Sequence, residues 1–212
     1  MATQMSEYPA KLSVDYPETP LNRTSTCFRI FAAIPIYIIL AVLNGGSFQM
    51  VHQSGIWRFG FGAGGALWFA TLLMILFRRK YPRWWFDFSV ALFKFATRVG
   101  AYLFLLRDEY PSTDEEQAIH IDFVYPDASK DLNRWLPLVK WLLAIPHYIV
   151  LFILWISAII VVFLAWFTIL FTGRYPRDMF DFVVGVFRWQ MRVQAYAFLL
   201  VTDRYPPFSL QP

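Results

Sequence analysis

Acidic and basic side chains recur at helical spacing in two segments of this chain. Asp87, Lys94 and Arg98 lie in the first segment, and Asp181, Arg188 and Arg192 lie in the second. Spacings of seven and then four residues place the three side chains of each segment on one face of a helix. Ammonium and guanidinium groups on such a face can bind the phosphate of a lipid headgroup or an acidic partner. The candidate contact residues are Arg83, Lys94, Arg98, Arg177, Arg188 and Arg192.

The same pattern has two other interpretations. A solvated helix face explains it without any ligand. A proton or ion pathway would require both segments to cross a membrane, where each buried cation costs at least ~2.5 kcal/mol. Pairing with Asp87 or Asp181 would reduce that cost, so a spanning arrangement remains an alternative.

No other residues form a recognisable catalytic or metal-binding pattern. His52, His120 and His147 are isolated, and no two of them have helical ligand spacing. The glycine-rich run 60–65 lacks the lysine of a phosphate-binding loop and has apolar surroundings. The single cysteine, Cys27, cannot form an intrachain disulfide. We therefore expect a protein that is not an enzyme and has no cofactor and no metal.

The composition of the chain departs from that of a soluble domain. Of its 212 residues, 58% are hydrophobic, 20% are aromatic and 16% are charged. A soluble domain has roughly 45–50% apolar and about 25% charged residues, so we expect a bilayer to form part of the solvent. The net charge is +4, and the basic residues lie beside apolar runs. This placement indicates that the partners are membrane lipids with anionic headgroups rather than nucleic acid.

The chain contains an internal repeat, which constrains its architecture. Residues 80–111 contain Lys-Tyr-Pro-Arg, Phe-Asp-Phe, Ala-Tyr, Leu-Leu and Tyr-Pro in that order. Residues 174–206 contain Arg-Tyr-Pro-Arg followed by the same four motifs. The repeat predicts two tandem membrane units, residues 1–111 and 112–212.

Hydrophobic periodicity predicts similar elements in both units. Alternating polar and apolar residues predict short strands over 11–17 and 118–126, and these two strands could pair. Residues 84–106 and 178–200 combine apolar and charged faces, which predicts amphipathic helices in the plane of the water–lipid interface.

Apolar runs occupy the remainder of each unit. In the first unit, the runs 27–43 and 66–77 predict a helical hairpin. In the second unit, one run, 142–171, has no charged residue over thirty positions, whereas a single membrane span needs about 20.

A difference in length favours a hairpin in the second unit too. The interval 35–81 covers 46 positions and the matching interval 146–175 covers 29, so the first unit has seventeen extra residues. Insertions are tolerated in exposed loops but poorly inside a buried helix. We therefore predict that the run 142–171 turns near residues 155–157. One long helix is the alternative, because no glycine or proline marks that turn.

Under the hairpin interpretation, nearly all basic residues lie on one side of the membrane. Such an excess marks the cytoplasmic side. We therefore expect a multi-pass protein with both termini in the cytoplasm.

The second unit resembles a known family. The motifs that carry the resemblance are Ile-Pro-His-Tyr-Ile at 145–149, Ala-Trp-Phe at 165–167, Leu-Phe-Thr-Gly-Arg-Tyr-Pro at 170–176, Phe-Arg-Trp at 187–189 and Tyr-Pro-Pro-Phe at 205–208. They are similar to a bacterial membrane family known as domain of unknown function 4389. The similarity covers most of residues 118–210, and the first unit matches more loosely. It implies a bacterial integral membrane protein, but it implies no activity and no catalytic residues.

These observations predict an all-α integral membrane protein of the bacterial inner membrane. Each of its two tandem repeats would contain a short strand, an apolar helical hairpin and an amphipathic interfacial helix. We expect a non-catalytic accessory or scaffold subunit of a larger membrane complex or homo-oligomer, or a membrane-shaping protein. The alternative is a small transporter or channel in which Arg98 and Arg192 line a pathway.

Overall fold

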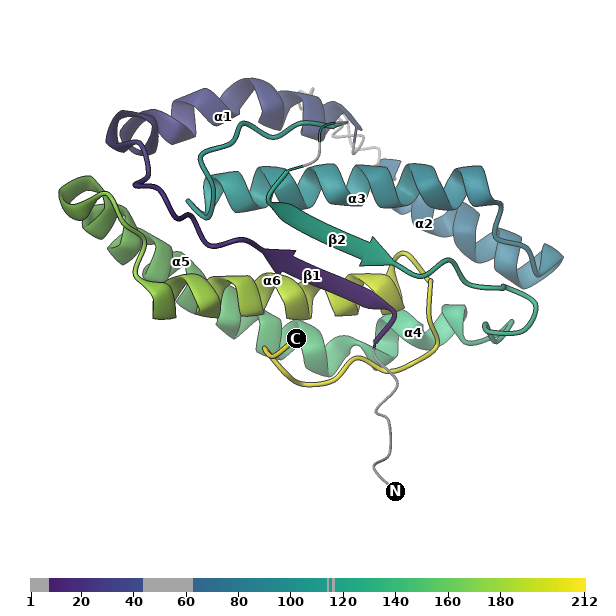
Figure 1. Ribbon diagram of the computed structural model, residues 1–212. Coiled ribbons are helices and arrows are strands. Elements are labelled where there is room, and N and C mark those ends of the chain that lie inside the picture. The colour runs from purple at the N-terminus through teal and green to yellow at the C-terminus, as the bar shows by residue number, and fades with distance from the viewer. Residues whose placement is uncertain (1–7, 44–62, 114, 116) are drawn as a thin grey trace, which may run out of the picture.

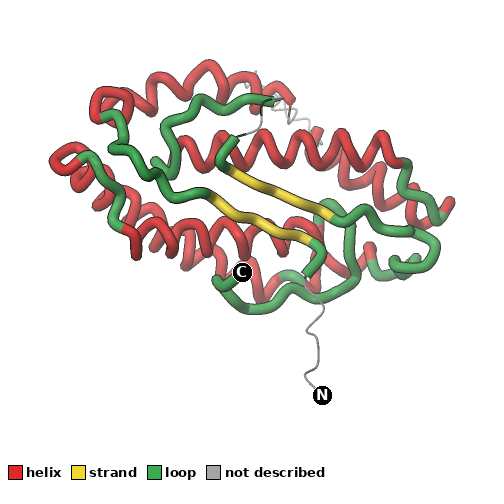
Figure 2. The backbone as a smooth tube through the Cα atoms, in the orientation of Figure 1, coloured by secondary structure: helices red, strands yellow, loops and turns green. Residues whose placement is uncertain are grey.

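The computed structural model describes residues 8–43, 63–113, 115 and 117–212. The fold is mostly helical, with one two-stranded sheet (Figures 1 and 2). In chain order the elements are β1 (Ala10–Val14), α1 (Arg23–Leu43), α2 (Ala63–Leu73), the π-helical turn η1 (Met74–Arg78), α3 (Arg83–Leu103), β2 (Ile119–Phe123), α4 (Pro137–Leu143), α5 (Ile145–Thr172) and α6 (Arg177–Ala197).

The elements form three layers. Helix α6 packs against β1 on one side and against α5 on the other, and α3 lies between β2 and α1 in the same way. The outer helices α1 and α5 also contact each other, and the Trp166 indole N–H donates to the Thr26 carbonyl oxygen across that contact. The layers are therefore the sheet, then α3 with α6, then α1 with α5 (Figure 1).

The two predicted strands exist and pair, as the alternating pattern indicated. They are antiparallel, and Leu12 lies opposite Ile121 at the centre of the register. The buried face carries Ala10, Leu12, Ile119 and Ile121. The exposed face carries Lys11, Ser13, His120 and Asp122, and Lys11 lies directly opposite Asp122. The sheet therefore has one apolar face against the helices and one polar face toward solvent.

Helix α6 occupies the centre of the fold, and this placement corrects one prediction. We expected the apolar face of residues 178–200 to lie against lipid. Instead that face, including Val183, Val186 and Met191, is buried in the hydrophobic core, with α5 packed against one side of the helix. The segment is an amphipathic helix, but its periodicity reflects contact with protein on both sides.

Helix α5 is one continuous helix, so the predicted hairpin over 142–171 is wrong. A short helix, α4, precedes it, and the break falls at Ala144, before Pro146 in the first turn of α5. Proline suits a first helical turn because its missing N–H would have no intrahelical partner there. At the expected turn, the Ser157 hydroxyl donates to the Ile153 carbonyl oxygen one helical turn earlier.

In the first half of the sequence, the region that corresponds to α5 contains two separate helices. Helix α1 ends at Leu43 and α2 begins at Ala63. The predicted turn of the first hairpin falls on residues 44–62, outside the described part of the chain. The described part of α1 packs against α3 and α5.

Several contacts occur in both halves and connect them. The Tyr16 hydroxyl donates to the Tyr175 carbonyl oxygen at 2.5 Å, and the Tyr125 hydroxyl donates to the Tyr81 carbonyl oxygen at 2.5 Å. Each tyrosine therefore crosses from one half of the sequence to the other. The division into units at residues 1–111 and 112–212 remains a prediction.

Candidate functional site

The outer face of α5 is apolar and exposed along its whole length. Eleven large side chains of α5 are between 42% and 78% exposed: Ile145, Ile149, Phe152, Ile153, Ile156, Ile159, Ile160, Phe163, Leu164, Phe167 and Phe171. The buried residues, among them Leu151, Ala158 and Ala165, lie on the opposite face, which packs against α6. Helix α5 thus has one stripe that faces other helices and a second, apolar stripe that no described residue covers.

Helix α1, which contacts α5, also has exposed apolar residues. Its buried stripe contains Arg29, Ala33 and Ile36, and these residues face α3. Its exposed residues include Phe28, Ile30, Phe31, Ile34, Ile38 and Ile39. We call the exposed apolar residues of α1 and α5 together the apolar face. By length and composition, α1 and α5 could each cross a membrane.

Arg83 and Arg177 are the first residues of the two middle-layer helices, one position before each predicted segment, and both are exposed. The Arg177 guanidinium lies 4.7 Å from the centre of the Tyr16 ring, and the Arg83 guanidinium lies 5.6 Å from the centre of the Tyr125 ring. These are cation–π contacts with the tyrosines that connect the halves. Both arginines are accessible to solvent.

Lys94 and Arg98 lie on α3 and are half-buried. An Arg98 guanidinium N–H donates to the Ser112 carbonyl oxygen at 2.7 Å. Arg98 therefore holds the segment that follows α3.

Arg188 and Arg192 lie on α6 and reach the final residues of the chain, 201–212, which we call the tail. Arg188 donates through Nε to the Leu12 carbonyl oxygen at 3.1 Å and through Nη1 to the Leu210 carbonyl oxygen at 3.0 Å. Arg192 donates to the carbonyl oxygens of Ser209 and Gln211, and its side chain is only 4% exposed. The structure brings these two predicted residues together, on the side of α6 away from α5.

A cavity of 540 Å³ lies beside these two arginines, between β1, α6 and the tail. We call it the cationic pocket. Its charged and ionisable lining residues are Tyr8, Lys11, His120, Asp122, Arg188, Arg192, Arg204 and Tyr205. Burial lowers the pKa of the Arg192 guanidinium, and the neighbouring positive charge of Arg188 lowers it further. Burial also lowers the pKa of Arg188, while Asp181 opposes that change.

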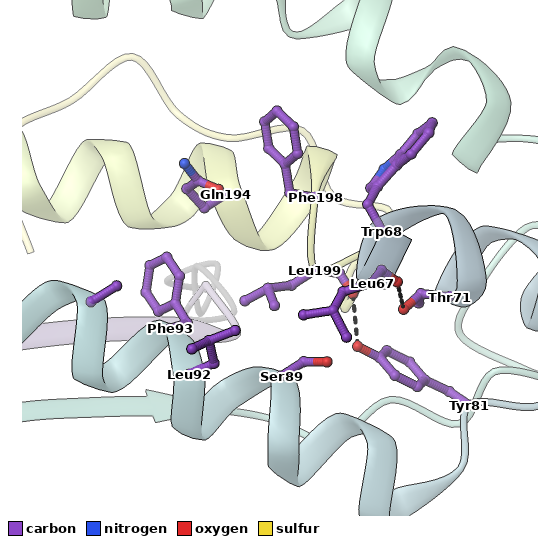
Figure 3. Close-up of a pocket in the computed structure, with 11 residues that line it drawn as sticks. Leu67, Trp68, Thr71, Tyr81, Ser89, Leu92, Phe93, Gln194, Phe198 and Leu199 are labelled. Atoms are coloured by element: carbon purple, nitrogen blue, oxygen red, sulfur yellow. Dashed lines mark hydrogen bonds between the residues drawn. The ribbon is translucent and has the colours of Figure 1, made fainter. Parts of the chain in front are cut away.

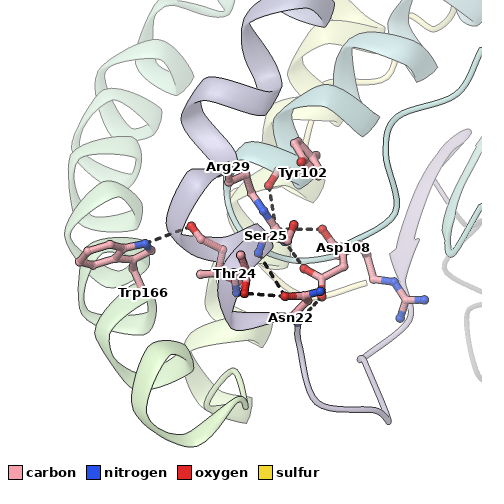
Figure 4. A network of polar contacts seen from close by, with 9 residues as sticks. Asn22, Thr24, Ser25, Arg29, Tyr102, Asp108 and Trp166 are labelled. Atoms are coloured by element: carbon pink, nitrogen blue, oxygen red, sulfur yellow. Dashed lines mark hydrogen bonds and ion pairs between the residues drawn. The ribbon is translucent and has the colours of Figure 1, made fainter.

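Two ion pairs in which the cation is buried were not predicted from the sequence. The Arg29 guanidinium contacts the Asp108 carboxylate and donates to the Tyr102 and Arg107 carbonyl oxygens (Figure 4). The Lys140 ammonium lies 2.7 Å from the Asp203 carboxylate and donates to the Thr202 carbonyl oxygen. The repeat contained a usable signal, because both cations precede a matching proline by six residues.

The two described histidines, His120 and His147, each contact other side chains. The Trp189 indole N–H donates to Nδ1 of His147 at 3.0 Å, and the Phe208 ring stacks on His147 at 4.0 Å. His120 lies 3.2 Å from the Asp15 carboxylate. His52 lies outside the described residues. Within the described ranges, no group of three or more His, Cys, Asp or Glu side chains could hold a metal ion.

A second cavity, of 390 Å³, is mostly apolar and lies between α2, α3 and α6 (Figure 3). The hydroxyl groups of Tyr81 and Ser89 lie close together on one side of it. The Tyr81 hydroxyl donates to the Leu199 carbonyl oxygen at 3.0 Å. This hydrogen bond connects the segment before α3 to the segment after α6.

Residues 135–209 match the model of a family described as Domain of unknown function (DUF4389). The resemblance that the motifs of the second unit indicated is therefore confirmed. The matched span includes α4, α5, α6 and most of the tail, whereas β1 lies outside it. Comparisons with curated proteins and with solved structures found no match.

Proposed function

We propose that this protein lies in one leaflet of a membrane, with its apolar face in the hydrocarbon, and acts there as a non-catalytic membrane-shaping scaffold. The apolar face of α5 and α1 carries this proposal. Soluble monomers rarely expose a contiguous apolar patch larger than a few hundred Å². An uncharged helix of 28 residues with eleven exposed large apolar side chains therefore needs an apolar environment.

The three layers favour an in-plane orientation over a spanning one. At 1.5 Å per residue, α5 is about 42 Å long, which is enough to cross roughly 30 Å of hydrocarbon. However, α6 lies alongside α5, and β1 lies alongside α6 (Figure 1). If α5 crossed the bilayer, the open sheet edges and the polar side chains of Lys11, His120 and Asp122 would reach hydrocarbon depth. Lipid offers no hydrogen-bond partners to such groups.

An in-plane orientation would place the apolar face in hydrocarbon and the polar face of the sheet in water. One helix layer is about 10–12 Å thick, which fits within half of a ~30 Å hydrocarbon core. The sheet then faces water on the opposite side. Exposed cations lie at the ends of several helices: Arg23 begins α1, Arg174 follows α5, Arg78 ends η1, and Lys80 lies between η1 and α3. There they would contact anionic headgroups, together with Arg83 and Arg177.

Insertion into a single leaflet has a mechanical consequence. It expands one leaflet and leaves the other unchanged, so it favours curved membranes. An accessory-subunit role would instead place the same apolar face against another membrane protein. The two roles differ in whether lipid alone suffices as the partner.

Vesicle flotation tests the proposal. The double variant Ile153→Glu with Ile160→Glu places two carboxylates on the apolar face. Each charge at hydrocarbon depth costs at least ~2.5 kcal/mol, so we expect the two together to lower vesicle binding by more than about three orders of magnitude. The matched control, Thr19→Glu with Val124→Glu, changes two exposed positions away from that face and should bind as the wild type does.

The vesicle size then separates the possible roles. Membrane shaping predicts preferential binding to small vesicles and tubulation of large ones. Equal binding to all sizes, together with a co-purifying membrane protein, would replace it with the accessory role. Ion flux through reconstituted protein, abolished by Arg98→Gln or Arg192→Gln, would contradict the proposal and favour a transporter or channel.

A further inference from the structure

The 390 Å³ cavity between α2, α3 and α6 is the basis of this inference, and we call it the inner cavity (Figure 3). Its apolar lining comes from α2, α3 and the segment after α6, and it includes Leu67, Leu92, Phe93, Ala96, Phe198 and Leu199. None of the residues described as lining it is charged, and none belongs to α1 or α5. The inference therefore does not rest on the proposed function.

Two of the hydroxyl groups that line the inner cavity already have partners. The Thr71 hydroxyl donates to the Leu67 carbonyl oxygen and accepts a hydrogen bond from the Trp85 indole N–H, both at 2.9 Å. The Tyr81 hydroxyl donates to the Leu199 carbonyl oxygen at 3.0 Å. Neither hydroxyl therefore has a hydrogen left to donate.

The Ser89 hydroxyl differs from both. Ser89 is 7% exposed, and its hydroxyl oxygen has no hydrogen-bond partner among the described residues. Several other helical hydroxyls of this protein donate to the carbonyl oxygen four residues earlier, namely those of Thr71, Thr97, Ser157, Thr168 and Thr172. The Tyr81 hydroxyl lies close to Ser89 (Figure 3), but its hydrogen is directed at Leu199. The Ser89 oxygen therefore lacks a donor even if Ser89 shares its own hydrogen with Tyr81.

This arrangement suits a ligand better than it suits water. Buried water typically makes about three hydrogen bonds to polar groups that lack other partners. The inner cavity offers few such groups beside Ser89, because Thr71 and Tyr81 are already bonded and the Gln194 amide lies across the cavity (Figure 3). A buried hydroxyl without a partner costs free energy, which a ligand hydroxyl would recover by donating to the Ser89 oxygen.

We propose that the inner cavity binds an uncharged, mostly apolar alcohol, whose chain contacts the apolar lining and whose hydroxyl group donates to the Ser89 oxygen. The volume of 390 Å³ falls within the range of small-molecule sites. An ionised ligand is unfavourable, because the described lining supplies no counter-charge. An alkane can fill the same space but leaves the Ser89 oxygen without a donor.

Three probes of equal chain length separate these requirements: decanol, decane and ionised decanoate. Saturable binding of each isotopically labelled probe is measured on the full chain in phosphatidylcholine nanodiscs, after subtraction of partitioning into protein-free discs. We expect one decanol per chain, bound about tenfold more tightly than decane, because decanol alone can form the hydrogen bond to Ser89. Decanoate should bind at least about tenfold more weakly than decanol.

The chain offers matched variants for this experiment. Ser89→Ala removes only the hydroxyl, so decanol and decane should then bind with similar affinity. Ala96→Leu fills the inner cavity and should abolish saturable binding of both probes. Ala91→Leu makes the same change at an exposed position of α3 outside the lining and should leave binding unchanged. No saturable binding of decanol by the wild type, an unchanged preference for decanol in Ser89→Ala, or equal effects of the two leucines would overturn the proposal.

Discussion

Asp108 and Asp203 each connect three segments through one carboxylate. Asp108 meets the buried Arg29, and Asp203 meets the buried Lys140. Each carboxylate also accepts a backbone N–H from an asparagine, at 2.6 Å in the first half and 2.5 Å in the second. Burial lowers the pKa of the Lys140 ammonium, and Asp203 opposes this change. The carboxylate therefore keeps a buried cation compatible with the fold.

Removing the Asp203 carboxylate should lower the free energy of unfolding more than replacing Lys140 with an uncharged side chain of similar volume. We expect Asp203→Ala to lower the free energy of unfolding by about 3–5 kcal/mol, because it leaves a buried charge without its partner. Lys140→Met fills a similar volume without a charge and should cost far less. Thermal unfolding of both variants in the same detergent checks the difference, and equal losses would contradict this role for Asp203.

The side-chain positions show what residue spacing can and cannot predict. The spacing of Asp181, Arg188 and Arg192 correctly placed the two arginines on one side of a helix. It could not show that this side is covered by β1 and the tail. Strand β1 is distant from Arg188 in the sequence, and the tail has no regular secondary structure. Neither contact therefore leaves a periodic signal around Arg188.

Helix α5 illustrates the same limit for a whole element. The hairpin prediction used a length difference between the units, but that difference lies in the first half, where α1 and α2 are separate helices. Between Pro146 and Gly173 the sequence contains neither glycine nor proline. Local signals therefore favoured a continuous helix, and here they were better evidence than the comparison of repeat lengths. The paired strands, by contrast, followed directly from alternation.

A proline in the middle of α5 distinguishes a helix from a turn. Ile156 is 46% exposed, so its replacement removes little packing. In a continuous helix, Ile156→Pro loses a backbone hydrogen bond and introduces a clash, and we expect a cost of about 3 kcal/mol or more. Ile156→Ala is the control for the lost side chain. Unfolding midpoints in lipid or detergent measure both, and an equal effect of proline and alanine would indicate a turn at this site.

At the scale of the whole molecule, the two halves of the sequence are not separate bodies. Strand β1 from the first half covers α6 from the second, and Tyr16 and Tyr125 cross between the halves in opposite directions. These exchanged contacts make one layered structure from the whole described chain. They also place the polar sheet and the apolar face on opposite sides of it.

This separation of polar and apolar sides underlies the proposed in-plane orientation, and depth measurement along α5 tests it most directly. Spin labels are attached to single cysteines replacing Ile149, Ile156, Phe163 and Phe171 in a Cys27→Ser background, and their depth in vesicles is measured by oxygen and metal-complex accessibility. All four positions are exposed on the apolar face. The first and last are about 33 Å apart along the helix, which matches the ~30 Å hydrocarbon core. The in-plane orientation predicts four similar depths within one leaflet. Shallow labels at both ends with the deepest labels between them would show that α5 crosses the bilayer and would contradict the proposal.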